Sequence, residues 1–189
     1  TNVAIFKPGT TEELDYGEEG EICISGPSVM LGYLNNPEET EKVMVTHPDG
    51  TVWVHSGDLG CMDSDGFIFI KGRIKRMITR FDGHKIFPVQ IESIIGMHEA
   101  VQSCAVVGVN DSEHAQGMQA LAVVKLRQGA DETAVREELK KKMEAELEDR
   151  GRPKFLHFVE EMPLAGMGKI DYNKLAADFN AFINANIAV

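Results

Sequence analysis

The spacing of hydrophobic residues over the first 72 residues predicts short strands. Gly20 to Gly26 alternates around a short strand bounded by glycines, and Thr51 to His55 predicts a second strand. Asp65-Gly66 predicts a hairpin turn before Phe67 to Ile70. Asn36-Pro37 can begin a helix, because asparagine is a good N-cap and proline suits the first helical position. We therefore expect a small, distorted β-subdomain here.

The pattern changes after residue 72. Residues 77–87 predict a hairpin around Asp82-Gly83, and Pro88 begins a helix. Further strands are expected over residues 101–109, 119–126 and 155–159. We expect Asp131 to cap a helix that ends at Gly151 and Pro153, with the apolar stripe Val135, Leu139, Met143 and Leu147. We expect Asp171 to cap a last helix, with the apolar face Leu175, Phe179 and Ile183.

Together these elements predict an α+β fold in two parts. A β-subdomain would cover residues 1–72, and a small sheet covered by helices would cover residues 73–189. The boundary is expected between Gly72 and Lys75. A ligand site that lies across such a hinge is a common arrangement.

The charge distribution favours a small polyanionic ligand near that boundary. The chain carries a net charge of −11, yet residues 71–85 hold six basic side chains and one acid. Such a local reversal of sign concentrates field where an anion binds. The acidic balance of the whole argues against general binding to nucleic acids or anionic membranes.

Five segments resemble motifs of the adenylate-forming superfamily, which includes the AMP-binding acyl-CoA synthetases. Residues 56–60 (SGDLG), 72–78 (GRIKRMI) and 81–92, which end in GHKIFPVQIE, resemble three motifs around the hinge. Residues 17–40 and 163–171 (PLAGMGKID) resemble two more. The five occur in the family's order and cover its C-terminal third. The resemblance therefore implies the last subdomain of the large AMP-binding domain, followed by a mobile lid domain.

Lys169 is the strongest candidate for catalysis. It lies in a loop with two glycines between a predicted strand and a helix cap. The resemblance implies that it is the family's adenylation lysine, which stabilises charge that develops as a carboxylate attacks the α-phosphate of ATP. A lysine suits this role because it is a point charge on a long stem. The alternative is that Lys169 is an ordinary exposed loop lysine without a catalytic role.

The other candidate residues follow from the same resemblance. Asp58 would accept the ribose hydroxyls of ATP or AMP, and Arg73 would donate to the ribose or the α-phosphate. Lys75 matches the hinge position. Gly83, His84 and Lys85 resemble the segment that lines the pantetheine tunnel for CoA. A turn-forming aspartate and solvated basic residues are the plain alternatives.

The resemblance implies an AMP-forming carboxylate:CoA ligase that uses ATP, CoA and Mg²⁺. The glutamate that binds magnesium in the family is expected outside this chain, as is the pocket for the carboxylic acid. Two alternatives stay open. One is an adenylation domain that serves a carrier protein, although Lys75 resembles the acyl-CoA branch. The other is a non-catalytic module that binds adenylate or a partner protein.

Composition adds three expectations. The sequence has no apolar run near the ~20 residues of a membrane span and no secretory signal, so we expect a cytoplasmic protein. Cys23, Cys61 and Cys104 have no paired spacing, which favours buried reduced thiols. The chain begins at Thr1, so it looks like a piece of a longer protein, with the N-terminal domain as its partner.

Overall fold

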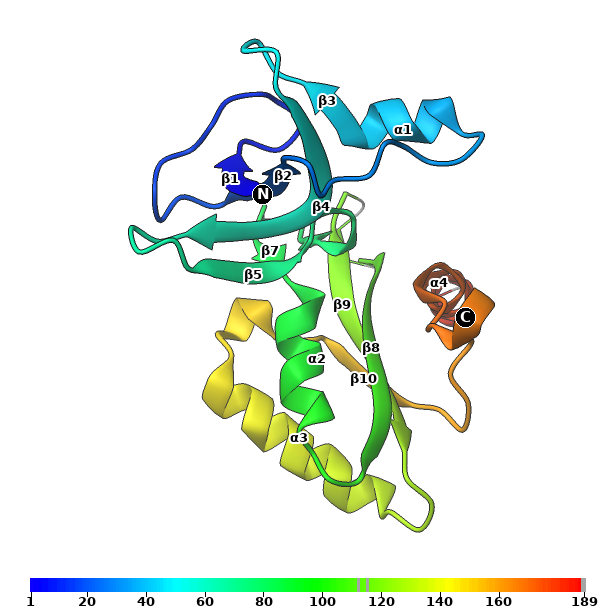
Figure 1. Cartoon of the computed structure of the whole chain (residues 1–189). Helices are drawn as coiled ribbons and strands as arrows, with labels where there is room; N and C mark the ends of the chain where they lie inside the picture. Colours follow the sequence, from blue (N-terminus) through cyan, green and yellow to red (C-terminus); the bar gives the residue numbers. More distant parts are fainter. Residues whose placement is uncertain (112, 115, 188–189) are drawn as a thin grey trace. The chain divides into compact units, whose positions relative to one another are not determined.

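A computed structural model describes residues 1–111, 113–114 and 116–187, with side chains as far as residue 181 (Figure 1). The chain divides into two compact units, Thr1–Lys75 and Arg76–Val189. The division lies three residues beyond the predicted end of the β-subdomain at residue 72.

The first unit is an antiparallel sheet with one short helix. Strands β1 (Asn2–Phe6), β2 (Gly20–Ser25), β4 (Val52–Met62) and β3 (Met44–Thr46) lie in that order, and β5 (Ile68–Arg73) also pairs with β4. Helix α1 (Pro37–Val43) begins as predicted, because the Asn36 side chain accepts a hydrogen bond from the Glu39 amide. A small core of Ala4, Phe6, Cys23 and Trp53 holds the sheet together.

Strand β4 is longer than the sequence indicated. The predicted strand ended at His55, but β4 continues through the SGDLG segment to Met62. Between two paired positions, β2 contributes only Ile22, whereas β4 contributes Ser56, Gly57 and Asp58. These three residues therefore bulge out of the ladder, with Gly57 at a φ of 74°. The bulge made this part of the strand look like a turn in the sequence.

The second unit contains a three-stranded sheet in the order β10-β9-β8. Strands β8 (Val101–Asn110) and β9 (Met118–Leu126) are antiparallel, while β10 (Phe155–Phe158) runs parallel to β9. The short strands β6 (Ile78–Thr79) and β7 (Lys85–Ile86) form the predicted hairpin. The helices are α2 (Pro88–Gly96), α3 (Glu132–Glu146) and α4 (Tyr172–Ile187), and the 3-10 turns are η1 (Ile74–Arg76), η2 (Asp149–Gly151) and η3 (Gly166–Gly168).

Helices cover both faces of this sheet (Figure 1). Alternate strand residues point to opposite faces, and two apolar clusters divide along this alternation. Val106, Ala122 and Val124 pack with residues of α2 and α3. The adjacent Val107 and Val123 pack with Leu175 and other residues of α4. The arrangement confirms the predicted α+β fold with a small sheet covered by helices.

Helix α3 ends earlier than predicted. Asp131 caps its start by accepting hydrogen bonds from the Thr133 and Ala134 amides, as expected. At the other end Leu147 has an extended backbone, and η2 follows before Gly151 and Pro153. Leu147 still packs against the apolar cluster of α2 and α3, so its place in the stripe did not require a helical backbone. Of the predicted face of α4, Leu175 is buried, while the side chain of Ile183 lies outside the described residues.

Candidate functional site

Asp58 and Arg73 lie side by side in the first unit, on facing positions of β4 and β5. Nη1 of Arg73 donates hydrogen bonds to Oδ1 of Asp58 at 3.0 Å and to the Ser56 carbonyl at 3.1 Å. The Asp58 side chain is 31 % exposed and that of Arg73 is 58 % exposed. A carboxylate and a guanidinium are thus presented together at the edge of the SGDLG bulge.

Gly60 shows why the motif needs a second glycine. A Cβ at this position would lie 2.6 Å from the Phe69 carbonyl oxygen of β5. Any side chain there would push β5 away from β4 and move Arg73 with it. Gly57 instead provides the positive φ of the bulge.

Lys75 is exposed at the end of the first unit, within η1. Together with Arg73 it lines a cavity of about 600 Å³. Other lining residues come from the bulge, from α1 and from the loop after β1, and they include Ser56, Gly57, Lys42 and Thr10. The cavity is of a size that holds a small molecule. Its wall carries the cations of Lys42, Arg73 and Lys75 and several hydroxyls, together with the carboxylates of Glu21 and Glu39, so it offers partners for a ligand with both anionic and hydroxyl groups.

Gly83, His84 and Lys85 lie in the β6–β7 hairpin of the second unit. Gly83 has a φ of 79° and closes the turn by donating its amide to the Arg80 carbonyl at 3.0 Å. Lys85 is exposed and His84 is half-buried. The neighbouring Phe81 ring stacks on the His114 ring, with centroids 3.6 Å apart and an interplanar angle of 3°. The turn is therefore anchored, while Lys85 remains accessible.

Lys169 lies in an exposed loop at the C-terminal end of the second unit. The Ala165 amide donates to the Lys169 carbonyl at 2.7 Å, and Leu164 bridges Ile170, so the loop is closed at its base. Met167 and Gly168 adopt positive φ values of 61° and 74°. These turns direct the chain back towards Asp171, whose carboxylate accepts a hydrogen bond from the Lys174 amide and caps α4. The loop presents the Lys169 side chain to solvent.

The predicted site residues are thus divided between the two units. Asp58, Arg73 and Lys75 belong to the first, and Gly83, His84, Lys85 and Lys169 belong to the second. The structure brings Asp58 and Arg73 into direct contact.

Two groups of polar residues were missed by sequence reasoning. In the first unit, Glu21 and His55 form a buried pair behind the SGDLG bulge. In the second, Arg76 pairs with Glu92. Arg76 belongs to the hinge motif and Glu92 closes the segment that follows it, so both were visible as motif members. Glu21 stood in an apparently ordinary strand, GEICIS, and nothing in the spacing indicated its partner.

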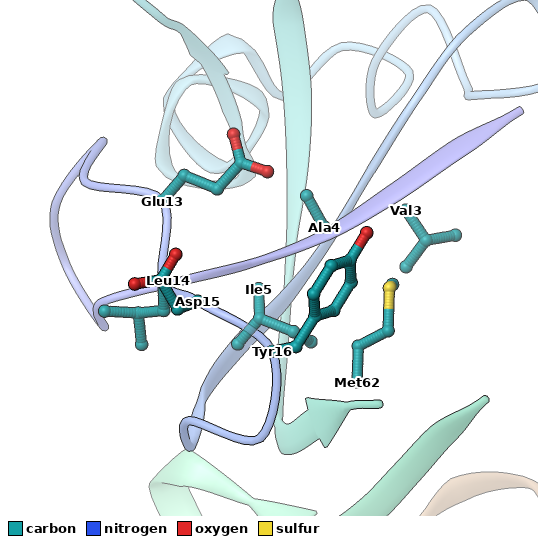
Figure 2. A pocket seen from close by; sticks show the side chains of 8 residues that line it. All are labelled: Val3, Ala4, Ile5, Glu13, Leu14, Asp15, Tyr16 and Met62. Atoms are coloured by element: carbon teal, nitrogen blue, oxygen red, sulfur yellow. The ribbon is translucent and has the colours of Figure 1, made fainter. Parts of the chain in front are cut away.

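A second cavity in the first unit holds none of the predicted residues (Figure 2). Its volume is about 340 Å³, and it is lined by residues of β1, by Met62 and by the segment Glu13 to Tyr16. Its wall carries the carboxylates of Glu13 and Asp15 and no cation among the lining residues, which does not suit an anionic ligand.

Possible metal ligands form two groups among the described residues. These are Glu21, Cys23 and His55, and Asp111, Glu113 and His114. All three cysteines are free, and Cys23 is fully buried, whereas Cys61 and Cys104 are only partly buried. Burial, reinforced by the Glu21 carboxylate, raises the pKa of the Cys23 thiol to about 12. Cys23 therefore stays a neutral thiol at physiological pH.

The sequence and the fold are both similar to those of known AMP-binding enzymes. Residues 90–169 match the profile of the AMP-binding enzyme C-terminal domain. The chain as a whole resembles the C-terminal portion of adenylate-forming enzymes, as its motifs predicted.

Individual relatives are named as CoA ligases or synthetases. Over 167 residues the chain is 38 % identical to the medium/long-chain-fatty-acid–CoA ligase FadD8 of Mycobacterium tuberculosis, covering 86 % of this chain and 28 % of FadD8. It is 37 % identical to the putative acyl-CoA synthetase YngI of Bacillus subtilis, covering 93 % of this chain and 30 % of YngI. The crystal structure of ATP-bound MatB from Rhodopseudomonas palustris aligns with a TM-score of 0.74 at 31 % identity, over 95 % of this chain and 34 % of MatB.

The chain thus spans about a third of the length of the relatives it matches. No helix among the described residues is both long and apolar enough to cross a membrane.

Proposed function

We propose that this chain is the C-terminal portion of an AMP-forming carboxylate:CoA ligase. The observation that carries the proposal is the similarity to CoA ligases over 86–93 % of the chain. In the first half-reaction a carboxylate oxygen attacks the α-phosphorus of ATP, and pyrophosphate leaves. In the second, the CoA sulfur attacks the acyl carbon, and AMP leaves.

Lys169 carries the first half-reaction. Negative charge develops between the carboxylate and the α-phosphate as they meet, and an ammonium group placed there lowers the barrier by about 3–4 kcal/mol. The exposed loop with its two positive-φ residues supports this role, because it can present a long cation to a ligand held elsewhere.

Asp58 and Arg73 bind the nucleotide. The Asp58 carboxylate accepts the ribose hydroxyls, while Arg73 donates to the ribose or the α-phosphate. Their contact supports the assignment, since the guanidinium keeps the carboxylate oriented without enclosing it. Because Asp58 is paired with Arg73, it does not suit Mg²⁺. Magnesium would accompany ATP, and we place its protein ligand outside these 189 residues.

The second unit acts as a lid that turns about Lys75. In its second position, the β6–β7 hairpin lines the path of the pantetheine arm. Gly83 permits close approach of the backbone, Lys85 meets a CoA phosphate, and His84 borders the tunnel. The exposed position of Lys75 at the division between the units supports the hinge assignment.

The direct test is product analysis with the complete ligase that carries this chain. Incubation with ATP, CoA and a panel of carboxylic acids should yield AMP, pyrophosphate and acyl-CoA in equal amounts. Medium- and long-chain fatty acids come first in the panel because FadD8 is named for them. Formation of ADP, or nucleotide turnover without any acyl-CoA, would contradict the proposal.

The same assay separates the two alternatives. An adenylation domain that serves a carrier protein would load a pantetheinylated carrier protein and leave CoA unacylated. A non-catalytic module would bind adenylate without turnover. The isolated 189-residue chain should show no carboxylate-dependent ATP–pyrophosphate exchange, because the family's Ser/Thr/Gly-rich phosphate loop is absent from its sequence.

A further inference from the structure

A buried carboxylate lies directly behind the SGDLG bulge. The bulge removes Ser56, Gly57 and Asp58 from the β2–β4 ladder, so their backbone amides need other partners. Glu21 of β2 supplies one of them, since its Oε1 accepts a hydrogen bond from the Gly57 amide at 2.9 Å. Glu21 is only 7 % exposed.

The other oxygen of Glu21 extends the contact into a chain of side chains. Oε2 lies 2.9 Å from Nδ1 of His55, and Nε2 of His55 lies 3.1 Å from Nε2 of His47. His47 is 5 % exposed and packs edge-on against Phe6, with ring centroids 4.6 Å apart. We call Glu21, His55 and His47 the buried relay.

The hydrogen bonds define the polarity of the buried relay. A carboxylate only accepts, so His55 must donate from Nδ1. With His55 neutral, its Nε2 is then an acceptor, and His47 must donate from its own Nε2. Glu21 thus fixes the tautomer of His55, and His55 fixes that of His47, because the hydrogen bond made by one ring nitrogen decides which nitrogen carries the proton.

The buried relay holds the residues on both sides of Ser56. Glu21 contacts His55 and Gly57, and Ser56 lies between them. The Ser56 hydroxyl accepts a hydrogen bond from the Asp58 amide at 3.0 Å, and its carbonyl accepts one from Arg73 at 3.1 Å. Any shift of Ser56 would therefore move both Asp58 and Arg73.

We propose that Glu21, supported by His55 and His47, is a positioning residue for nucleotide binding. It fixes the conformation of the bulge and so aims the Asp58 carboxylate and Arg73 at the ribose. This inference rests on the proposed function of Asp58. Burying a carboxylate costs folding free energy unless its oxygens accept hydrogen bonds. Both oxygens of Glu21 do so, one from the Gly57 amide and the other from His55, and these two bonds hold the bulge in place.

The test compares three variants of the complete ligase, with Asp58→Ala as the reference. Glu21→Ala removes both hydrogen bonds and should raise KM for ATP by roughly 10- to 100-fold, since a displacement of about 1 Å can cost 100-fold. Glu21→Gln keeps an acceptor for Gly57 and should stay within about threefold of the wild type, which corresponds to less than 1 kcal/mol. Glu41→Gln, on the exposed face of α1, is the matched control and should change nothing.

Coupling distinguishes positioning from general destabilisation. If Glu21 acts through Asp58, Glu21→Ala should add little to KM for ATP once Asp58→Ala is present. The proposal would be overturned if KM for ATP in the double variant rose by the product of the two single-variant increases. It would also be overturned if Glu21→Gln impaired the enzyme as strongly as Glu21→Ala. If Asp58→Ala alone leaves KM for ATP unchanged, the ribose assignment fails, whatever Glu21 does.

Histidine NMR gives a readout that needs no activity. In the ¹⁵N spectrum of the 189-residue chain, His55 should be protonated at Nδ1. In Glu21→Gln the new amide donates to Nδ1 while its oxygen keeps Gly57, so the proton of His55 should move to Nε2. A His55 tautomer that is the same in both proteins would overturn the relay, even if Glu21→Ala fails to fold.

Discussion

At the residue scale, Asp111 shows how hydrogen bonds hold a buried carboxylate next to the β6–β7 hairpin. It is buried at the end of β8, where its oxygens accept from the Glu113 amide at 2.9 Å and from His114 Nδ1 at 3.0 Å. Burial alone would raise the pKa of Asp111, but hydrogen bonds from Gln119, the Glu113 amide and His114 outweigh it and lower the pKa to about 2. His114 in turn stacks on Phe81 of the hairpin.

Asp111→Asn should therefore destabilise the chain in a pH-dependent way. The folded-state pKa lies below the ordinary value of 3.8, so the stabilisation is present above about pH 4 and is lost as the pH falls towards 2. We expect a loss of roughly 1–3 kcal/mol at pH 7, measured by urea unfolding of the chain.

The control for this prediction is Asp149→Asn, because the side chain of Asp149 is 94 % exposed. It should stay within about 0.5 kcal/mol of the wild type at every pH. An Asp111→Asn difference that persists unchanged at pH 2–3 would show that the charge of Asp111 is not the cause.

At the element scale, Arg76 joins four parts of the second unit. Its Nη2 pairs with Glu92 of α2 and also donates to the Val106 carbonyl of β8 at 3.3 Å. Its guanidinium lies 3.8 Å from the ring centroid of Tyr172, the first residue of α4. Glu92 accepts in turn from the Val106 amide at 2.8 Å. The end of η1 is thereby fastened to the sheet and to a helix on each face.

Arg76→Ala should weaken the second unit more than a surface change would. It leaves Glu92 partly buried without its cation, and the side chains are 26 % and 15 % exposed. We therefore expect a loss of about 2 kcal/mol, below the roughly 3–5 kcal/mol of a fully buried pair. Calorimetry of the chain checks this. As a control, Arg127→Ala should cost less than about 1 kcal/mol, because Arg127 is exposed and its side chain donates to one backbone carbonyl, that of Glu99.

Most elements could be predicted from the sequence because their signals are local. The caps at Asn36, Asp131 and Asp171 and the hairpin at Asp82-Gly83 each depend on residues a few positions apart. The continuation of β4 through SGDLG depends on Glu21, more than 30 residues away. The buried relay and the Arg76–Glu92 pair also join residues that are far apart in the sequence. No local sequence pattern predicts such contacts.

In the candidate site too, the sequence predicted which residues take part but not the long-range contacts that hold them. Lys169, Asp58, Arg73 and Lys75 followed from the resemblance of their motifs, and the structure adds that Asp58 and Arg73 touch. Sequence could not supply the reason why they hold their positions, since Gly60 and Ser56 act through contacts with a neighbouring strand or side chain.

At the scale of the whole molecule, the division after Lys75 leads to a prediction about the lid. Lys75→Pro fixes φ at its own position and restricts the preceding residue. If the lid turns here between the half-reactions, this variant should retain ATP–pyrophosphate exchange and lose thioester formation. Lys75→Ala keeps backbone freedom and should retain both steps. Equal loss of the two steps in Lys75→Pro would argue against a hinge at this residue.

The most direct measurement separates the half-reactions in the complete ligase with Lys169→Ala. Carboxylate-dependent ATP–pyrophosphate exchange reports adenylate formation, and acyl-CoA formed from a supplied acyl-adenylate reports the second step. The account predicts that exchange falls by about 100- to 1000-fold, while the second step stays near the wild-type rate. Lys174→Ala, in the first turn of α4, should leave both steps intact. Undiminished exchange by Lys169→Ala would contradict the central role assigned to this lysine.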